Sequence, residues 1–146
     1  MADVFDVAEY ILQKRGPMTA WKLQKLVYYS QAWSLVWDQK PIFPERIEAW
    51  ANGPVSPALY QQHRGEFIVK EIPTGAADAL DKDECETVDA VLEYYGAMHP
   101  QVLSDLTHSE APWKDARGNL PPGANCQTEI TQEAMASFYE SLPPAA

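Results

Sequence analysis

The sequence predicts a mainly α (α+β) fold, a compact bundle of about six helices with a small two-stranded β element. Apolar residues recur at helical spacing in several segments, whereas strand-like alternation is confined to ERIEAWA (45–51) and FIVKEI (67–72). The apolar share is 46% in 146 residues, which is enough for one packed core. A chain of this length fits one domain and buries about two-thirds of its unfolded surface. We therefore predict a single domain spanning residues 1–146.

Two helices are predicted at the start of the chain. The apolar stripe of the first runs from Val4 to Leu12, with Asp3 as N-cap and Gly16-Pro17 as the end. Thr19 caps the second helix, and Lys25 is expected away from its apolar face. That apolar face holds residues at 3.6-residue spacing, namely Leu23, Leu26, Val27, Trp33 and Trp37.

A turn at Asn52-Gly53-Pro54 follows the first predicted strand, ERIEAWA. Ser56 and Pro57 then begin a third helix, because serine caps a helix and proline at its first position loses no hydrogen bond. The segment FIVKEI is the second predicted strand. We expect the two strands to pair as a ribbon that leans on the helices, since such a ribbon is unstable alone.

The second half of the chain is predicted to be helical. Asp83 and Glu86 fit a capping-box variant ahead of a stripe that ends at Tyr95. Pro100 opens the next helix, and Ala111-Pro112 is expected to interrupt it, because the residue before proline avoids the helical conformation. Thr131 caps the last helix. Its predicted buried stripe is Met135, Phe138, Tyr139 and Leu142.

Charge and composition narrow the classes of function. The formal net charge is −10 and the pI is near 4.6, so phosphate backbones are repelled and nucleic-acid binding is not expected. No run of 18 apolar residues suits a membrane span, and the acidic N-terminus lacks the basic region of a signal peptide. We predict a cytoplasmic protein whose field attracts a basic partner. Cys85 and Cys126 fit no metal-ligand spacing, so two reduced thiols are expected.

The only partial catalytic signature is His108-Ser109-Glu110, which matches the HxE half of the zinc deaminase motif. The PCxxC half is missing, since Cys126 stands alone. Ser104 lies four residues before His108, but no GxSxG elbow accompanies the pair. We predict that His108 interacts with the end of its helix, with no catalytic residue, metal or cofactor. A metal-dependent hydrolase using His108 and Glu110 remains an alternative.

Tryptophan and tyrosine are abundant, with five and seven residues. Each buried indole N–H needs a partner, and both residue types anchor protein interfaces. Most of the five tryptophans are predicted to pack in the core, and one or two are predicted to anchor an interface. The stretch WANGPVSPALY (50–60) holds a single glycine and no Lys-Ser/Thr pair, so it is not a phosphate-binding loop.

Four stretches in this order resemble the Panacea domain, the family of SocA-type and GepA-like phage-associated antitoxins. They are KLQKLVYYSQAW (22–33), IEAWANGPVSPALY (47–60), LSDLTHSEAPWKDAR (103–117) and ITQEAMASFYESL (130–142). The resemblance implies an antitoxin of a type II toxin–antitoxin system, which neutralises a co-encoded protein toxin by binding it. It also implies an alternative, a proteolytic adaptor that delivers the toxin to the ClpXP protease. Family members with an added DNA-binding domain exist, but this chain has no room for one.

The motif positions carried over from the family divide into two groups. Those predicted to line an exposed or semi-exposed partner-binding groove are Lys25, Trp50, Tyr60, His108 and Trp113. Those predicted to be structural are Gly53, Pro54, Pro57 and Pro112. The expected partners are therefore a cognate toxin and, in the adaptor alternative, ClpXP, with no nucleic acid and no membrane.

Overall fold

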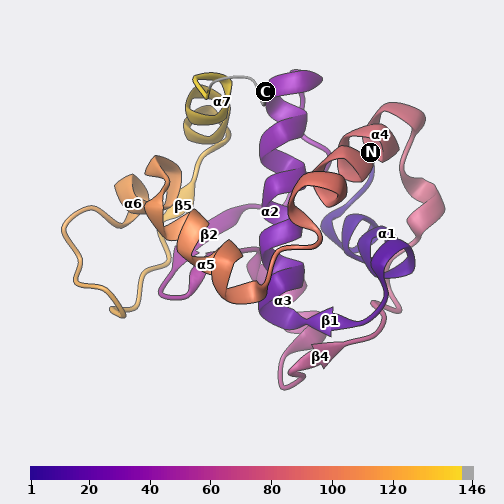
Figure 1. Ribbon diagram of the computed structural model, residues 1–146, viewed down its shortest axis with the longest axis horizontal. Helices are drawn as coiled ribbons and strands as arrows, with labels where there is room; N and C mark the ends of the chain where they lie inside the picture. The colour runs from indigo at the N-terminus through magenta and orange to yellow at the C-terminus, as the bar shows by residue number, and fades with distance from the viewer. Residues whose placement is uncertain (143–146) are drawn as a thin grey trace.

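A computed structural model describes residues 1–142 and shows a mainly α protein with a minor β component (Figure 1). The predicted fold class is confirmed. The described residues form seven α-helices and a short 3-10 helix, η1 (Ala77–Ala79). The α-helices are α1 (Val4–Arg15), α2 (Ala20–Trp37), α3 (Pro57–His63), α4 (Lys82–Tyr95), α5 (Pro100–Ser109), α6 (Ala111–Arg117) and α7 (Gln132–Glu140).

The additional helix relative to the prediction is α6. The sequence predicts that Ala111-Pro112 only interrupts the preceding helix, but these residues form the first turn of α6. Proline is tolerated there, because the N–H groups of the first turn have no acceptor within the helix. Within residues 1–142, none of the helices combines the length and the apolarity that a bilayer span requires.

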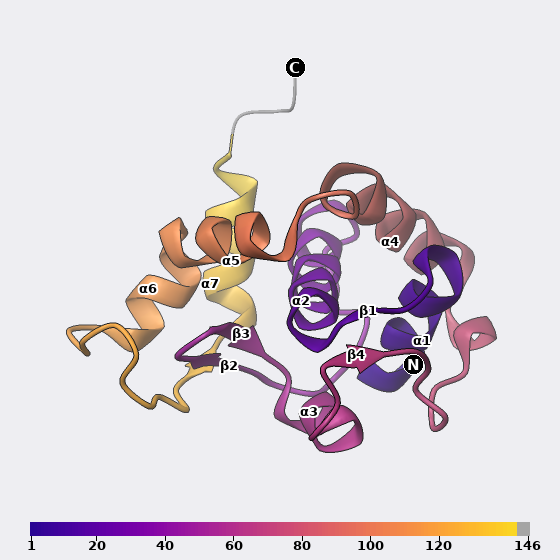
Figure 2. The ribbon, with the colours of Figure 1, turned by 60° about the horizontal axis from the view of Figure 1, so that its bottom comes forward.

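The strands form two small antiparallel sheets (Figure 2). One sheet pairs β1 (Met18–Thr19) with β4 (Ile68–Val69). In the other, β2 (Ile47–Trp50) lies between β3 (Gly53–Val55) and β5 (Glu129–Ile130).

The expected ribbon between ERIEAWA and FIVKEI is therefore wrong. The turn at residues 51–52 places Gly53 opposite Trp50, so β3 pairs with β2 at little cost in loop entropy. The sequence pattern did not predict β3 because it contains Pro54. Proline has no N–H to donate to a neighbouring strand and is tolerated only at the edge of a sheet.

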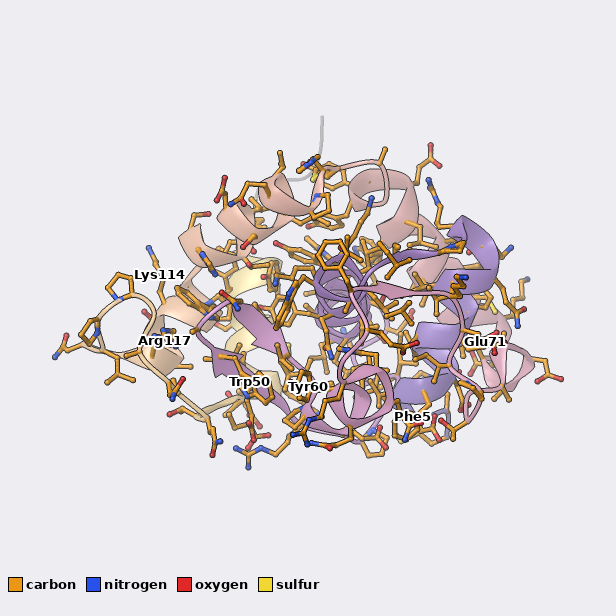
Figure 3. The ribbon with its side chains drawn as sticks, turned by 90° about the horizontal axis from the view of Figure 1, so that it is seen from below. Phe5, Trp50, Tyr60, Glu71, Lys114 and Arg117 are labelled. Carbon is orange, nitrogen blue, oxygen red and sulfur yellow. The ribbon has the colours of Figure 1, made fainter. Side chains whose placement is uncertain are left out.

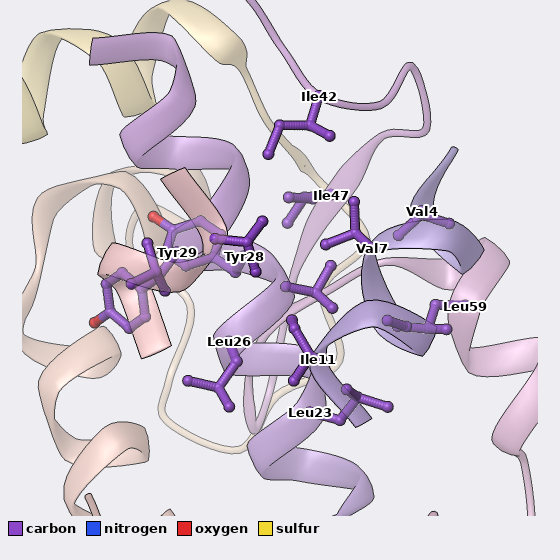
Figure 4. Close-up of a cluster of buried hydrophobic side chains, with 14 of the residues drawn as sticks. Val4, Val7, Ile11, Leu23, Leu26, Tyr28, Tyr29, Ile42, Ile47 and Leu59 are labelled. Atoms are coloured by element: carbon purple, nitrogen blue, oxygen red, sulfur yellow. The ribbon is translucent and has the colours of Figure 1, made fainter. Parts of the chain in front are cut away.

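Helix α2 runs through the centre of the molecule, with α1 and α4 on one side and α6 and α7 on the other (Figure 1). Because neighbours surround it, side chains on several of its faces are buried together, as Leu23, Leu26, Tyr28 and Tyr29 are (Figure 4). The prediction that Lys25 lies in an exposed or semi-exposed position on this helix is wrong. Lys25 is 2% exposed, whereas Trp37, predicted on the buried face, is 50% exposed.

Local capping signals fix most helix starts. Asp3, Thr19 and Thr131 each cap the predicted helix through a side-chain oxygen, which accepts a backbone N–H three residues on. The start of α4 differs from the prediction. Its capping box uses Asp81 and Glu84, two residues earlier than Asp83 and Glu86.

Ser56 caps α3 in a buried position, where its hydroxyl accepts the Leu59 N–H at 3.2 Å. We expect Ser56→Ala to lower the free energy of unfolding by about 1 kcal/mol, because it leaves that N–H without an acceptor. Urea denaturation of both proteins measures the difference. Ser137→Ala, at an exposed position of α7, is the control and should change stability by less than about 0.5 kcal/mol. Equal effects of the two substitutions would contradict this role of Ser56.

Candidate functional site

The turn between β2 and β3 lies against the side chain of Lys25 from α2. The ammonium of Lys25 donates to the Asn52 carbonyl at 2.7 Å and lies 5.3 Å from the centroid of the Trp21 ring. Burial lowers the pKa of Lys25 to about 8. Within the described part of the chain, no Asp or Glu oxygen lies within 4.0 Å of this ammonium. Lys25 is thus a buried cation without an acidic partner in residues 1–142.

Gly53 permits the close approach of this turn to Lys25. Its φ of +123° is rarely adopted by residues with a side chain. A Cβ built on Gly53 would lie 2.8 Å from Lys25 Cε and 3.4 Å from Thr107 Oγ1. Two requirements therefore favour glycine at position 53: a positive φ and the lack of room for a side chain.

Helices α5 and α6 meet the same turn through His108 and Trp113. The two rings stack at 4.3 Å between centroids, and the Trp113 indole donates to the Trp50 carbonyl at 2.8 Å. Among the described residues, the buried Nε2 atom of the partly exposed His108 has no hydrogen-bond partner. Burial, and then the charge of Lys25, lower the pKa of His108, which favours the neutral ring at pH 7.

Trp50 and Tyr60 form a partly exposed aromatic pair beside the turn (Figure 3). Their ring centroids lie 5.0 Å apart in an edge-to-face arrangement, which favours aromatic contact. The Trp50 indole donates to Glu48 Oε1 at 2.8 Å. The pair is thereby held in place while part of its surface remains accessible.

The structure brings all five predicted partner-binding residues together around the turn. Lys25, Trp50, His108 and Trp113 lie at the turn itself, and Tyr60 is connected to it through its ring contact with Trp50. Trp50, Tyr60, His108 and Trp113 are partly exposed, as predicted. Lys25 is the exception, since its side chain is buried rather than exposed. Pro54, Pro57 and Pro112 lie in β3 and in the first turns of α3 and α6. A contact with a partner remains a prediction for all five.

Gln24 is a motif residue whose role the sequence did not reveal. Its side-chain oxygen accepts the Ser56 N–H at 2.9 Å, and its amide nitrogen lies 3.0 Å from His63 Nε2. An amide nitrogen can only donate, so His63 Nε2 accepts and the ring is neutral. Burial lowers the pKa of His63 in agreement with this arrangement. The presence of a glutamine within an apolar helix was the sequence signal that could have indicated this role.

Glu110 lies in a buried cluster of tyrosines, which sequence reasoning also missed. Its Oε1 accepts the hydroxyls of Tyr29 at 2.7 Å and of Tyr139 at 2.8 Å. Because Tyr139 donates to Glu110, the hydroxyl of Tyr28 must be the donor in its 2.9 Å contact with Tyr139. Burial raises the pKa of Glu110, and the two tyrosine hydrogen bonds oppose that rise. The cluster joins α2, α6 and α7.

His108 and Glu110 are not paired in the way that the hydrolase alternative requires. The carboxylate of Glu110 is engaged by Tyr29 and Tyr139, whereas the His108 ring stacks on Trp113. The part of the chain that the structure describes contains no group of three His, Cys, Asp or Glu side chains placed to hold a metal ion. The geometry indicates a structural role for Glu110, as the hydrogen-bond acceptor of two buried tyrosines.

Two surface hollows adjoin the turn and share Trp21 and Asn52. One, of about 550 Å³, is also lined by Trp50 and Cys126. The other, of about 310 Å³, has Lys25 in its wall. We refer to Trp21, Trp50, Asn52, Tyr60 and Trp113 as the turn surface.

A separate aromatic hollow of about 580 Å³ lies between α2, α4 and α7. Trp37 and Tyr94 line it and are 50% and 60% exposed. The sequence placed Trp37 on the buried face of its helix, because helical spacing alone does not show where a helix emerges from its neighbours. Besides the turn surface, the described residues therefore present an exposed aromatic surface at this hollow.

The fold and the turn surface define a small, mainly α protein that presents a partly exposed aromatic surface. The family of proteins described as "Antitoxin SocA-like, Panacea domain" matches residues 23–114, which include all five predicted partner-binding residues. The chain is similar to Antitoxin SocA of Caulobacter vibrioides (strain NA1000 / CB15N), with 31% identity over 140 residues, 84% of this chain and 73% of that protein. No solved structure matches the chain significantly. The chain belongs to the SocA-like antitoxin family with a Panacea domain.

Proposed function

We propose that this protein is the antitoxin of a type II toxin–antitoxin pair and neutralises a co-encoded protein toxin in the cytoplasm by binding it directly. The observation that carries the proposal is the convergence of three family motifs on the turn surface. These motifs lie in α2, in the β2–β3 hairpin and across α5 and α6, yet Lys25 of α2 and Trp113 of α6 both donate to backbone carbonyls of the hairpin.

The chemistry of the turn surface suits a protein partner. Trp50, Tyr60 and Trp113 are held by ring contacts and hydrogen bonds, so little side-chain entropy is lost when a partner covers them. Tryptophan and tyrosine also contribute most to binding energy at interfaces. The net charge of −10 accelerates association with a basic toxin.

Co-expression with the protein encoded beside it tests the proposal. We expect that neighbour to arrest growth alone and the wild-type chain to restore growth. The double variant Trp50→Ala/Tyr60→Ala should bind the toxin at least tenfold more weakly in isothermal titration calorimetry, because two central aromatic anchors are lost. The matched control is Trp37→Ala/Tyr94→Ala, which removes two aromatic rings from the separate hollow between α2, α4 and α7.

Both double variants must first be compared with wild type by circular dichroism and thermal unfolding. A non-toxic neighbour, or no rescue by the wild-type chain, would refute the antitoxin role. Weaker binding by the folded Trp37/Tyr94 variant, with normal binding by the Trp50/Tyr60 variant, would refute the turn surface as the toxin-binding site. The antitoxin role itself would stand.

Direct binding and adaptor action predict different lifetimes of the toxin. Simple sequestration leaves its half-life unchanged or longer when the antitoxin is present. Delivery to ClpXP shortens the half-life, and loss of the protease reverses that effect. A pulse-chase measurement with and without this chain separates the two mechanisms.

A further inference from the structure

Lys25 is a buried charge whose hydrogen-bonding capacity is largely unused. Its ammonium has three N–H donors, and one of them has an acceptor, the Asn52 carbonyl, within residues 1–142. A buried charge is costly unless it is paired, and a neutral donor would serve to hold a backbone carbonyl. The turn alone therefore does not account for a lysine at this position.

The hollow of about 310 Å³ gives access to Lys25 from the surface. Trp21, Asn52, Pro100 and Ser104 help to line it, and no acidic residue among residues 1–142 does. That absence is notable, because Asp and Glu number 21 in this chain. The walls combine an indole and a proline ring with polar groups, which suits a short aliphatic stem that ends in an anion.

The ammonium is also held in one place. Its bond to Asn52, its position 5.3 Å from the Trp21 ring centroid and the closeness of Gly53 restrict the rotamers of Lys25. A charge that is fixed before binding loses less entropy when it meets a ligand.

We propose that this hollow, the Lys25 pocket, binds a carboxylate of a partner polypeptide, which forms an ion pair with Lys25. One negative charge balances the single ammonium, whereas a doubly charged phosphate is disfavoured by the net charge of −10. The carboxylate belongs either to an acidic side chain or to a chain terminus. That the partner is the toxin rests on the proposed function, but the pocket itself does not.

Small probes test the pocket without the toxin. N-acetylglutamate α-amide carries a side-chain carboxylate, N-acetylleucine carries a terminal one, and N-acetylglutamine α-amide is the neutral match. We expect at least one of the acids to shift the NMR signals of the Trp21 indole N–H and the Asn52 and Gly53 amides in a saturable manner. The neutral amide should bind at least tenfold more weakly. Equal binding of the amide, no saturable shift, or a response to inorganic phosphate alone would overturn the proposal.

Three variants locate the binding. Lys25→Met should abolish the response to the acids if it folds. Ser104→Glu places a carboxylate in the wall of the pocket and should weaken binding of the acids at least tenfold, while Ser104→Gln should change it less than threefold. Undiminished binding to folded Lys25→Met, or equal effects of the two Ser104 variants, would overturn the proposal.

The same Ser104 variants test whether the toxin uses the pocket. Toxin affinity should fall at least tenfold with Ser104→Glu and stay near wild type with Ser104→Gln. Equal toxin affinities of the two, together with Lys25-dependent binding of the acids, would overturn use of the pocket by the toxin. Failure of the growth rescue described above would refute the antitoxin role without affecting the probe titrations.

Discussion

Replacing Glu110 by alanine is expected to lower the free energy of unfolding by about 3–5 kcal/mol, since two buried tyrosine hydroxyls would lose their acceptor. Each unpaired buried donor costs about 1–3 kcal/mol. The substitution would also remove one of two hydrogen-bonded links between α7 and α2, because Tyr139 is joined to Tyr29 through this carboxylate and to Tyr28 directly. Urea denaturation followed by circular dichroism measures the loss.

Two control variants separate the hydrogen bonds from other effects of this substitution. Glu110→Gln keeps an acceptor oxygen and should cost about 1 kcal/mol or less, because the tyrosines retain a partner. Glu140→Ala removes an exposed carboxylate from α7 and should change stability by less than about 0.5 kcal/mol. A loss below about 1 kcal/mol in Glu110→Ala would show that the tyrosine cluster does not depend on the carboxylate.

Replacing Gly53 by alanine is expected to destabilise the protein by about 2–4 kcal/mol, because it combines backbone strain with overpacking. The φ of +123° is unfavourable for alanine, and the new methyl group would press on Lys25 Cε and Nζ. We expect Lys25 to be displaced from the Asn52 carbonyl, which would also weaken the binding of acids to the Lys25 pocket.

Gly65→Ala is the matched control for this substitution. Gly65 also has a positive φ, +88°, but a Cβ there would meet nothing within 4 Å. It should therefore cost about 1 kcal/mol from backbone strain alone. Thermal unfolding of both variants gives the comparison, and the excess loss in Gly53→Ala reports the contact with Lys25 together with the difference in φ between the two glycines. Equal losses would refute a packing role for Gly53.

The helices of this protein were largely predictable, because their starts depend on neighbouring residues. Asp3, Thr19 and Ser56 each accept a backbone N–H within one turn, so the sequence contains both partners of the interaction. The strand pairing was less predictable. β5 reaches β2 from about 80 positions away, and such a pairing is decided by the packing of the helices between them.

The same distinction applies to the candidate site. The motif residues Trp50, Tyr60, His108 and Trp113 could be chosen from the sequence, and the structure places them around one turn. The burial of Lys25 and the tyrosine partners of Glu110 could not, because both depend on segments that are distant in the chain.

By itself, the sequence determined the fold class, the resemblance to an antitoxin family and most of the helix starts, all of which depend on spacing and nearest neighbours. Only the tertiary structure decided which polar side chains of α2 are buried and what they meet. The physical reason is that Lys25 and Tyr29 lie on a helix that is enclosed by α4, α5 and α7 and by the β2–β3 hairpin. Burial, and with it the pKa and the chemistry of each side chain, is set by those distant segments.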